Sequence, residues 1–318
     1  AFFLYTCAIL IVLAIPEVIL REHYLFNLFN VMNGFEPLEH SLAGARLGVM
    51  RVTSIFSHPI LYGLFNASLL AILWYLSRTN GQRAFAVFVA LTGAFLSLSS
   101  GPILVSLVQI SLIGVETTTR WLKNRASYIM AGVGAMLLFV QTASNRGLFV
   151  LVVIFTLEPS SAYHRRSIWE NGIDDVMRNP IFGMLPEEWT RPFWMKPSID
   201  NYWLFQAMQG GIPSVLFLVL AILLIIRALY REPRDALPPA LEGLRRGWLF
   251  LIIAMMLCGA TVHFFDKLQP YFAFVVGSGA AAARLLADWR RERDAAPETT
   301  PDDAQPPDVA AAPPRSWL

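Results

Sequence analysis

The sequence predicts an all-α polytopic membrane protein, a helical bundle that carries one large extracytoplasmic loop domain. Of the 318 residues, 55% are hydrophobic and only 15% are charged, and the mean hydropathy is +0.50. Many of the apolar residues fall in runs close to the roughly 20 residues that span a bilayer. One polar, aromatic-rich stretch, residues 142–211, interrupts these runs and is too long for an ordinary connection.

Eight apolar stretches are predicted to cross the membrane, because each is near the required length and carries few charges. The pair Gly101-Pro102 predicts a tight turn at Ser97–Gly101, so the third and fourth stretches form a helical hairpin. The chain opens at Ala1 on an apolar run without signal-peptide features, which indicates a truncated start. The eight stretches are Phe2–Leu20, His58–Leu76, Arg83–Leu98, Pro102–Val115, Ala126–Gln141, Ile212–Ile226, Gly247–Val262 and Leu268–Leu286.

The basic residues of the short connections predict the orientation of these spans. Alternate threading puts four basic groups on one side, which is therefore the cytoplasmic side. The chain is then organised as N-terminal membrane helices (1–141) with an external loop at 21–57, a periplasmic loop domain (142–211), C-terminal membrane helices (212–286) and a disordered tail (287–318). The four groups are Arg78 and Arg83; Arg120, Lys123 and Arg125; Arg227, Arg231, Arg234, Arg245 and Arg246; and Arg284, Arg290, Arg291 and Arg293.

Two segments of the loop domain have predictable local structure. Gly147–Leu157 is apolar but too short for a comfortable span, so it is predicted to be re-entrant or interfacial. Apolar residues at helical spacing predict a short amphipathic helix over Ser167–Arg178, which Asn179-Pro180 ends.

Composition and motifs exclude several classes of function. The net charge of +2 is too small to indicate a nucleic-acid partner. Cys7 and Cys258 both lie in apolar runs and are expected to be packing residues. The sequence has no metal-ligand spacing, no phosphate-binding glycine-rich loop and no nucleophile-elbow motif, so no metal and no cofactor are predicted.

The first candidate group is Arg46, Arg51 and His58, at the external start of the second span. In one interpretation, Arg51 reaches lipid phosphates and His58 caps the helix that Pro59 begins. In the other, the arginines form a clamp for a phosphate, because a guanidinium binds phosphate through two parallel hydrogen bonds.

The second candidate group is Arg165, Arg166 and Trp169. The predicted helix places both arginines at its start, where the helix dipole disfavours a positive charge. The pair therefore indicates an anionic partner, although a solvated pair of charges is an equal alternative.

The third candidate group is Asp200, Asn201 and Tyr202, directly before an apolar helix. An Asp-Asn pair in this position is typical of a helix N-cap. The alternative is that Asp200 lies at the membrane surface and acts as a general base on a sugar hydroxyl.

The order of these motifs resembles that of the O-antigen ligase and polymerase superfamily of bacterial polysaccharide assembly. The similar stretches are Arg51–Gly63, which opens a span with Arg-x6-His-Pro, then Arg165–Gly183 with Arg-x3-Trp and Asn-Pro-x-x-Gly, and Asp200–Ile212 with Asp-Asn-Tyr and Gly-Gly-Ile. No single motif is specific, and the resemblance rests on their order and on the topology.

The resemblance implies a metal-independent glycosyltransferase of GT-C-like architecture in the bacterial inner membrane, active at its periplasmic face. Its donor is a glycan on undecaprenyl pyrophosphate. The catalytic residues that it implies are Asp200, Arg51 and Arg165, and six other residues bind the substrate. A chain-length regulator or a flippase is an open candidate partner besides membrane lipid. The substrate-binding residues are Arg46, His58, Arg166, Trp169, Asn201 and Tyr202.

Two departures from the family pattern bear on the type of reaction. Ligases typically carry His-Asn where this chain has Asp200-Asn201, which favours a repeat-unit polymerase over a ligase that transfers glycan to lipid A. The family commonly has Ser-Arg-Gly where this chain has Ser99-Ser100-Gly101, so one arginine is missing. A non-catalytic assembly scaffold and a transporter stay open as functions of another class.

Overall fold

The computed structural model is almost entirely helical and describes residues 2–34, 45–46, 48–119, 121–122, 135, 138–139, 141–142, 159–185, 188–195, 198–231 and 237–295. Apart from a few isolated positions, the predicted span Ala126–Gln141 lies outside these residues. So do the predicted interfacial segment Gly147–Leu157 and the tail beyond Ala295.

Ten helices and one small strand pair make up the described part of the chain. The strands β1 (Ala45–Arg46) and β2 (Val49–Met50) pair antiparallel, with Arg46 opposite Val49. The helices are α1 (Phe2–Leu20), α2 (Tyr24–Met32), α3 (Pro59–Ser68), α4 (Leu70–Leu76), α5 (Asn80–Leu96), α6 (Ser100–Thr118), α9 (Pro159–Arg178), α10 (Tyr202–Tyr230), α11 (Pro239–Cys258) and α12 (Leu268–Ala295).

Among the described residues, five helical segments are long and apolar enough to cross a membrane, which confirms a helical membrane protein. They are α1, α3 with α4, α6, α10 and α12. The other two predicted spans in the described part correspond to α5 and α11. The α5–α6 pair forms the predicted hairpin, with its turn at Ser97–Ser99.

Several predicted boundaries were wrong, three of them by about eight residues or more. The loop-domain helix α9 begins at Pro159 rather than Ser167, since proline favours a first helical turn, so Arg165 and Arg166 lie inside the helix. Helix α12 continues to Ala295, so residues 287–295 are helical and not part of a disordered tail; the Arg284–Asp288 pair at i,i+4 spacing supports this extension. Helix α11 begins at Pro239, before the predicted Gly247.

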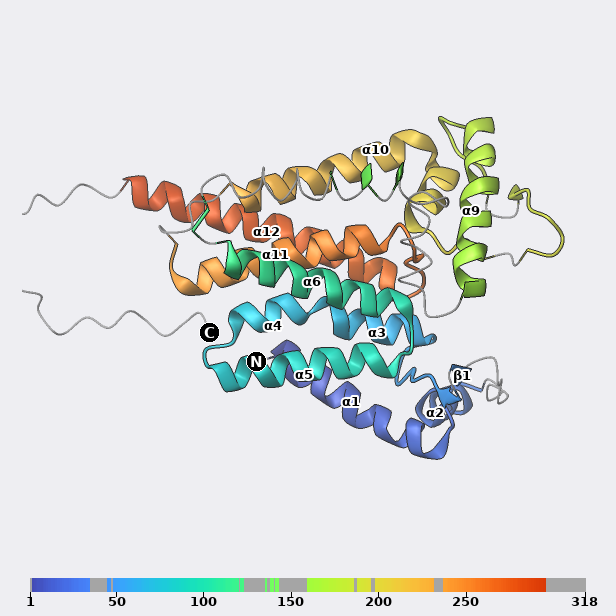
Figure 1. Cartoon of the computed structure of the whole chain (residues 1–318), viewed down its shortest axis with the longest axis horizontal. Coiled ribbons are helices and arrows are strands. Elements are labelled where there is room, and N and C mark those ends of the chain that lie inside the picture. Colours follow the sequence, from blue (N-terminus) through green and yellow to red (C-terminus); the bar gives the residue numbers. More distant parts are fainter. Residues whose placement is uncertain are drawn as a thin grey trace, which may run out of the picture.

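The bundle helices run side by side along the long axis of the molecule, and α9 lies across one end of them (Figure 1). The same end carries α2, β1, the α5–α6 turn, the start of α10 and the α11–α12 loop, so we call it the outer end. Helices α4 and α11 pack closely because Gly243 and Gly247 face α4; a Cβ on Gly247 would lie 3.0 Å from the Ile72 Cα. Because β1 and α9 both lie at the outer end, the two predicted external segments meet at one end of the packed bundle.

Helix α10 is kinked at Gly211, where φ is +70° and ψ is 177°. Its part before the kink packs under α9 in a second, smaller core that includes Ile168, Leu204 and Met208. The Asn179–Gly183 turn fits into the kink, and the Ile212 N–H donates to the Pro180 carbonyl at 2.8 Å. Two motifs of the sequence, Asn-Pro-x-x-Gly and Gly-Gly-Ile, thus contact each other and fix α9 over α10.

Candidate functional site

The α5–α6 turn is the structural centre of the candidate site. Ser97, Leu98, Ser99 and Ser100 are all buried at the outer end of the bundle. Leu98 has a left-handed backbone with φ of +44°, a conformation that is costly for a branched side chain and is concentrated at functional sites in proteins. The turn thereby presents backbone carbonyl and hydroxyl oxygens as hydrogen-bond acceptors to side chains from other segments.

Arginines from two separate segments, the β1–β2 hairpin with the residue that follows it and α9, converge on this turn. Arg51 donates from Nε to the Ser97 carbonyl at 3.1 Å and from a terminal nitrogen to Ser99 Oγ at 2.6 Å. Arg46, on β1, donates to the Leu98 carbonyl at 3.2 Å. Arg165, on α9, donates to Ser100 Oγ at 3.2 Å. We call Arg46, Arg51 and Arg165 the arginine cluster.

The arginine cluster brings three positive charges to the start of α6. Its members surround the first turn of α6, a 19-residue helix whose dipole adds positive potential at the same place. Arg51 is only 7% exposed, so it does not extend to lipid headgroups as the membrane-contact interpretation required. Guanidinium groups held together against the helix dipole suit an anion with several oxygens, such as a pyrophosphate.

Glu17, near the outer end of α1, fixes the segment that carries Arg51. Its fully buried carboxylate accepts hydrogen bonds from the backbone N–H groups of Thr53 at 2.9 Å and Ser54 at 3.0 Å. His23 Nδ1 lies 3.6 Å from the same carboxylate. Ser54 has a φ of +51°, so this carboxylate holds a strained turn that the chain would not keep alone.

The third predicted group lies beside the arginine cluster because α6 packs against the end of α11. Gly101 permits this approach, since a Cβ there would lie 2.7 Å from a methyl group of Val262. The α11–α12 loop in turn binds the start of α10: Tyr202 N–H donates to the Gly259 carbonyl at 2.8 Å, and Asn201 Nδ2 donates to the Ala260 carbonyl at 2.8 Å.

Asn201, and not Asp200, caps α10. The Asn201 side chain accepts from the Leu204 N–H at 2.9 Å, which satisfies the cap. No hydrogen bond or ion pair engages the Asp200 carboxylate within the part of the chain that the structure describes. Asp200 is partly exposed. Burial lowers the pKa of Arg165, and the nearby negative charge of Asp200 partly offsets this effect. The cap interpretation therefore applies to Asn201 and leaves Asp200 available for chemistry.

His263 is a candidate residue that the sequence did not single out. Its ring lies 4.1 Å from the Phe205 ring and stacks on Tyr202 and Phe265. Its Nδ1 is buried without a hydrogen-bond partner among the described residues. The sequence signal was a histidine in a short external loop next to an apolar span, which becomes informative only when the fold places that loop against Asp200.

Both histidines of the site are neutral at pH 7. The pKa of His58 is lowered to about 4, mainly by burial and further by the positive charges of Arg51 and Arg46. Burial lowers the pKa of His263 to about 4, against the opposing effect of the Asp200 charge. His58 Nδ1 also accepts from the Ile60 N–H at 3.1 Å, so His58 caps α3 and adds no positive charge to the arginine cluster.

Arg166 and Tyr202, two further predicted site residues, contact partners outside the arginine cluster. Arg166 is exposed and pairs with Glu170 at 2.7 Å on the outer surface of α9. Trp169 is 38% exposed on the same helix. The Tyr202 ring is buried and lies 4.7 Å from the Phe264 ring, which gives it a packing role. The structure thus brings together Arg46, Arg51, His58, Arg165 and Asp200, whereas Arg166 pairs with Glu170 on the surface and Trp169 lies one helical turn after Arg165, partly exposed.

The sequence matches no protein-family model, and no curated protein matches it at a significant level. The described residues also contain no group of three His, Cys, Asp or Glu side chains that could hold a metal ion.

Proposed function

We propose that this protein is a GT-C-like membrane glycosyltransferase that polymerises undecaprenyl-pyrophosphate-linked oligosaccharide repeat units into O-antigen or exopolysaccharide. Its active face is the periplasmic face of the bacterial inner membrane. The observation that carries the proposal is the convergence of Arg46, Arg51 and Arg165 on one buried turn, near the Asp200 carboxylate, which has no hydrogen-bond or ion-pair partner among the described residues. Such a site combines a receptor for a multiply charged leaving group with a base.

The reaction needs only groups that this site can supply. An acceptor sugar hydroxyl attacks the anomeric carbon of the donor, and the bond from that carbon to the pyrophosphate oxygen breaks. The leaving pyrophosphate keeps the electron pair, and the arginine cluster stabilises the charge that develops on it. Asp200 accepts the hydroxyl proton, with neutral His263 beside it.

The position of His263 favours an O-antigen ligase as a second candidate function. The ligases that the sequence resembles carry a histidine where this chain has Asp200. Here an imidazole reaches the same neighbourhood from the α11–α12 loop, stacked on Tyr202, two residues after Asp200. Burial lowers the pKa of His263 to about 4, so its neutral imidazole is a weak base that would accept a hydrogen bond from, and orient, the hydroxyl of lipid A or another acceptor.

The size distribution of glycans in cells with and without the protein tests the proposal. For a polymerase, we expect loss of the ladder, with single repeats left on their acceptor. Full-length polymer retained on the lipid carrier would instead establish the ligase. An unchanged glycan profile would contradict both enzymes and favour a scaffold or a transporter.

Variants expressed in the same cells distinguish an enzyme from a non-catalytic assembly scaffold. Asp200→Asn keeps the size of the side chain and removes its basicity, so the proposal predicts loss of glycan extension with normal protein levels in the membrane. Arg284→Ala is a matched change of one charge at the opposite end of α12, where the side chain is 86% exposed, and should leave the ladder intact. A scaffold would tolerate both changes.

A further inference from the structure

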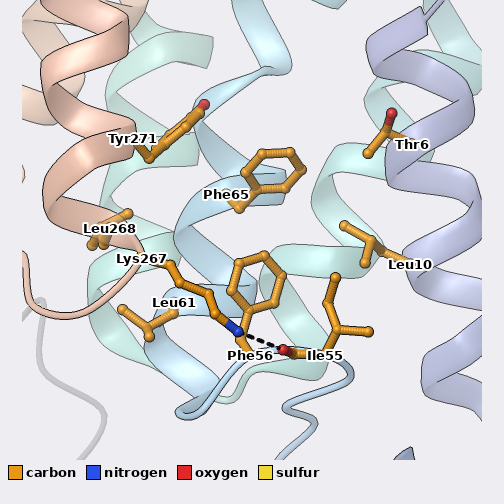
Figure 2. A pocket seen from close by; sticks show the side chains of 9 residues that line it. All are labelled: Thr6, Leu10, Ile55, Phe56, Leu61, Phe65, Lys267, Leu268 and Tyr271. Carbon is orange, nitrogen blue, oxygen red and sulfur yellow. Dashed lines mark hydrogen bonds between the residues drawn. The ribbon is translucent and has the colours of Figure 1, made fainter.

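A cavity of about 290 Å³ lies between α1 and α12, with α3 as its floor (Figure 2). Leu10, Leu61 and Leu268 contribute buried carbon surface to its walls, together with the rings of Phe56 and Phe65. All three helices belong to segments that are long and apolar enough to cross a membrane. The cavity therefore lies at membrane depth, and its walls favour hydrocarbon.

The two hydroxyl groups in the walls are already satisfied. Tyr271 OH and Ser68 Oγ are hydrogen-bonded at 2.7 Å, and Thr6 Oγ1 donates to the Phe2 carbonyl at 3.1 Å. Among the described residues that line the cavity, the charged one is Lys267, whose ammonium lies at the outer rim and keeps further donors beyond the one that Ile55 accepts. Figure 2 shows Lys267 next to Ile55, whose carbonyl accepts from Nζ at 3.2 Å.

Lys267 offers its positive charge to an incoming anion. The neighbouring carboxylate, Asp266, accepts a hydrogen bond from Ser57 Oγ at 2.6 Å, and no ion pair joins it to Lys267 in the described part of the chain. Asp266 has a φ of +49°, a left-handed turn that directs the chain into α12 just after Lys267. Apolar walls with one ammonium at the rim are complementary to a single hydrocarbon chain that ends in a phosphate.

The rim of the cavity is continuous with the arginine site. His58, whose pKa reflects the charges of Arg51 and Arg46, lies three residues after Ile55. Its ring contacts the Phe265 ring at 5.6 Å, and Phe265 lies two residues before Lys267. One pair of segments, residues 55–58 and 263–267, thus borders both the cavity and the candidate active site.

We propose that this cavity binds the phosphate-proximal part of the polyprenyl chain of the lipid carrier, with Lys267 beside the carrier's phosphates. The inference rests on the proposed function, because continuity with the arginine cluster is what favours the donor's carrier over an ordinary phospholipid. In this arrangement the chain enters sideways from the membrane between α1 and α12, and the glycan extends from the outer end. The carrier is then held at both the chain and the pyrophosphate during transfer.

Photo-crosslinking of the full-length protein in vesicles tests the inference without requiring turnover. The probe is a polyprenyl phosphate with a diazirine on its first isoprene unit. We expect crosslinks on α1, α3 and α12 at the cavity-lining positions. Thr6→Trp, which fills the cavity from α1, should lower the yield at least tenfold, whereas Ile9→Trp, at a 58% exposed position of the same helix, should not. Lys267→Ala should lower the yield and Arg284→Ala should not.

Two results would overturn the inference. One is labelling that maps elsewhere or that Thr6→Trp and Lys267→Ala leave unchanged. The other is equal labelling of the cavity by a diazirine-bearing phosphatidylglycerol, which would make it a site for ordinary lipid. Protein that extends glycans normally but fails the labelling test refutes the cavity alone; protein that labels in the cavity but never transfers a glycan refutes the glycosyltransferase alone.

Discussion

Replacing Gly211 by alanine should destabilise the protein and disturb the site from a distance. The glycine has φ of +70° and ψ of 177°, a backbone region that is essentially restricted to glycine and costs about 1–3 kcal/mol for other residues. A Cβ there would also collide with the Ile181 carbonyl and lie 2.8 Å from the Pro180 carbonyl. Because both atoms belong to the backbone, no side-chain rotation relieves the contact.

Relief of this collision requires the Asn179–Gly183 turn to move away from α10. That movement breaks the hydrogen bond from Ile212 N–H to the Pro180 carbonyl, which contributes about 1 kcal/mol. The total loss is then about 2–4 kcal/mol, or roughly 4–8 °C in apparent Tm at about 2 °C per kcal/mol. The first half of α10, which begins beside Asp200, would shift with the turn.

The assay is the apparent Tm of the detergent-solubilised protein, followed by the loss of monodisperse protein on heating. Gly114→Ala is the matched control: a Cβ at Gly114 in α6 meets nothing within 4 Å, so this change should leave the Tm the same or raise it, by up to about 1 kcal/mol of helix propensity. Equal Tm values for Gly211→Ala and Gly114→Ala would refute the role of the kink.

Three further predictions concern the site. Arg165→Ala should lower the rate of glycan transfer about 100-fold or more, which is the usual loss when one hydrogen-bond donor to the transition state is removed. Arg166→Ala should retain most of the rate because Arg166 points outward, and similar losses in the two variants would place both arginines at the substrate. Glu17→Ala should lower the apparent Tm, since it removes the carboxylate oxygen that accepts from the backbone N–H groups of both Thr53 and Ser54, and each group left unsatisfied costs about 1–3 kcal/mol; an unchanged Tm would show that the two N–H groups do not depend on Glu17. Burial lowers the pKa of His58 in the folded protein, so between pH 6.5 and 4 the unfolded chain binds a proton that the folded protein does not, and stability should fall as the pH decreases through this range. His58→Asn should reduce this acid sensitivity in a Tm series across the same range, and an identical pH dependence would contradict the lowered pKa.

The positions of the helices follow from hydropathy, and most of them were predictable. A run of apolar residues must be covered by lipid or protein wherever it lies, so α1, α3 with α4, α6, α10 and α12 were visible in the sequence. Helix ends were less predictable because they depend on a few polar contacts. Pro159 starts α9 eight residues early, and the pairing of Arg284 with Asp288 carries α12 past its apolar part.

The composition of the site was only partly predictable, because it depends on which segments meet. Arg51, Arg165 and Asp200 were chosen from local motifs, and the fold does bring their segments together. Arg166 was chosen for its neighbour, but adjacent positions on a helix point about 100° apart, so only one of the pair can face the turn. His263 was missed because its importance arises from the packing of the α11–α12 loop on α10.

The distinction between Asp200 and Asn201 also required the structure. Either side chain can cap a helix, and their order in the sequence does not show which one does. The hydrogen bond of the Asn201 side chain with the Leu204 N–H assigns the cap. This single contact removes the cap alternative for Asp200, which the sequence had left open beside its predicted role as a general base.

Transfer by the purified protein in vesicles tests the central claim most directly. The protein is supplied with undecaprenyl-pyrophosphate-linked repeat units, and the products are separated by size. We predict a ladder of extended glycans and release of undecaprenyl pyrophosphate with the wild-type protein and with Arg284→Ala, and neither product with Asp200→Asn or Arg165→Ala. Absence of both products with the wild-type protein, or equal ladders from all four proteins, would contradict a catalytic role for the arginine cluster and Asp200.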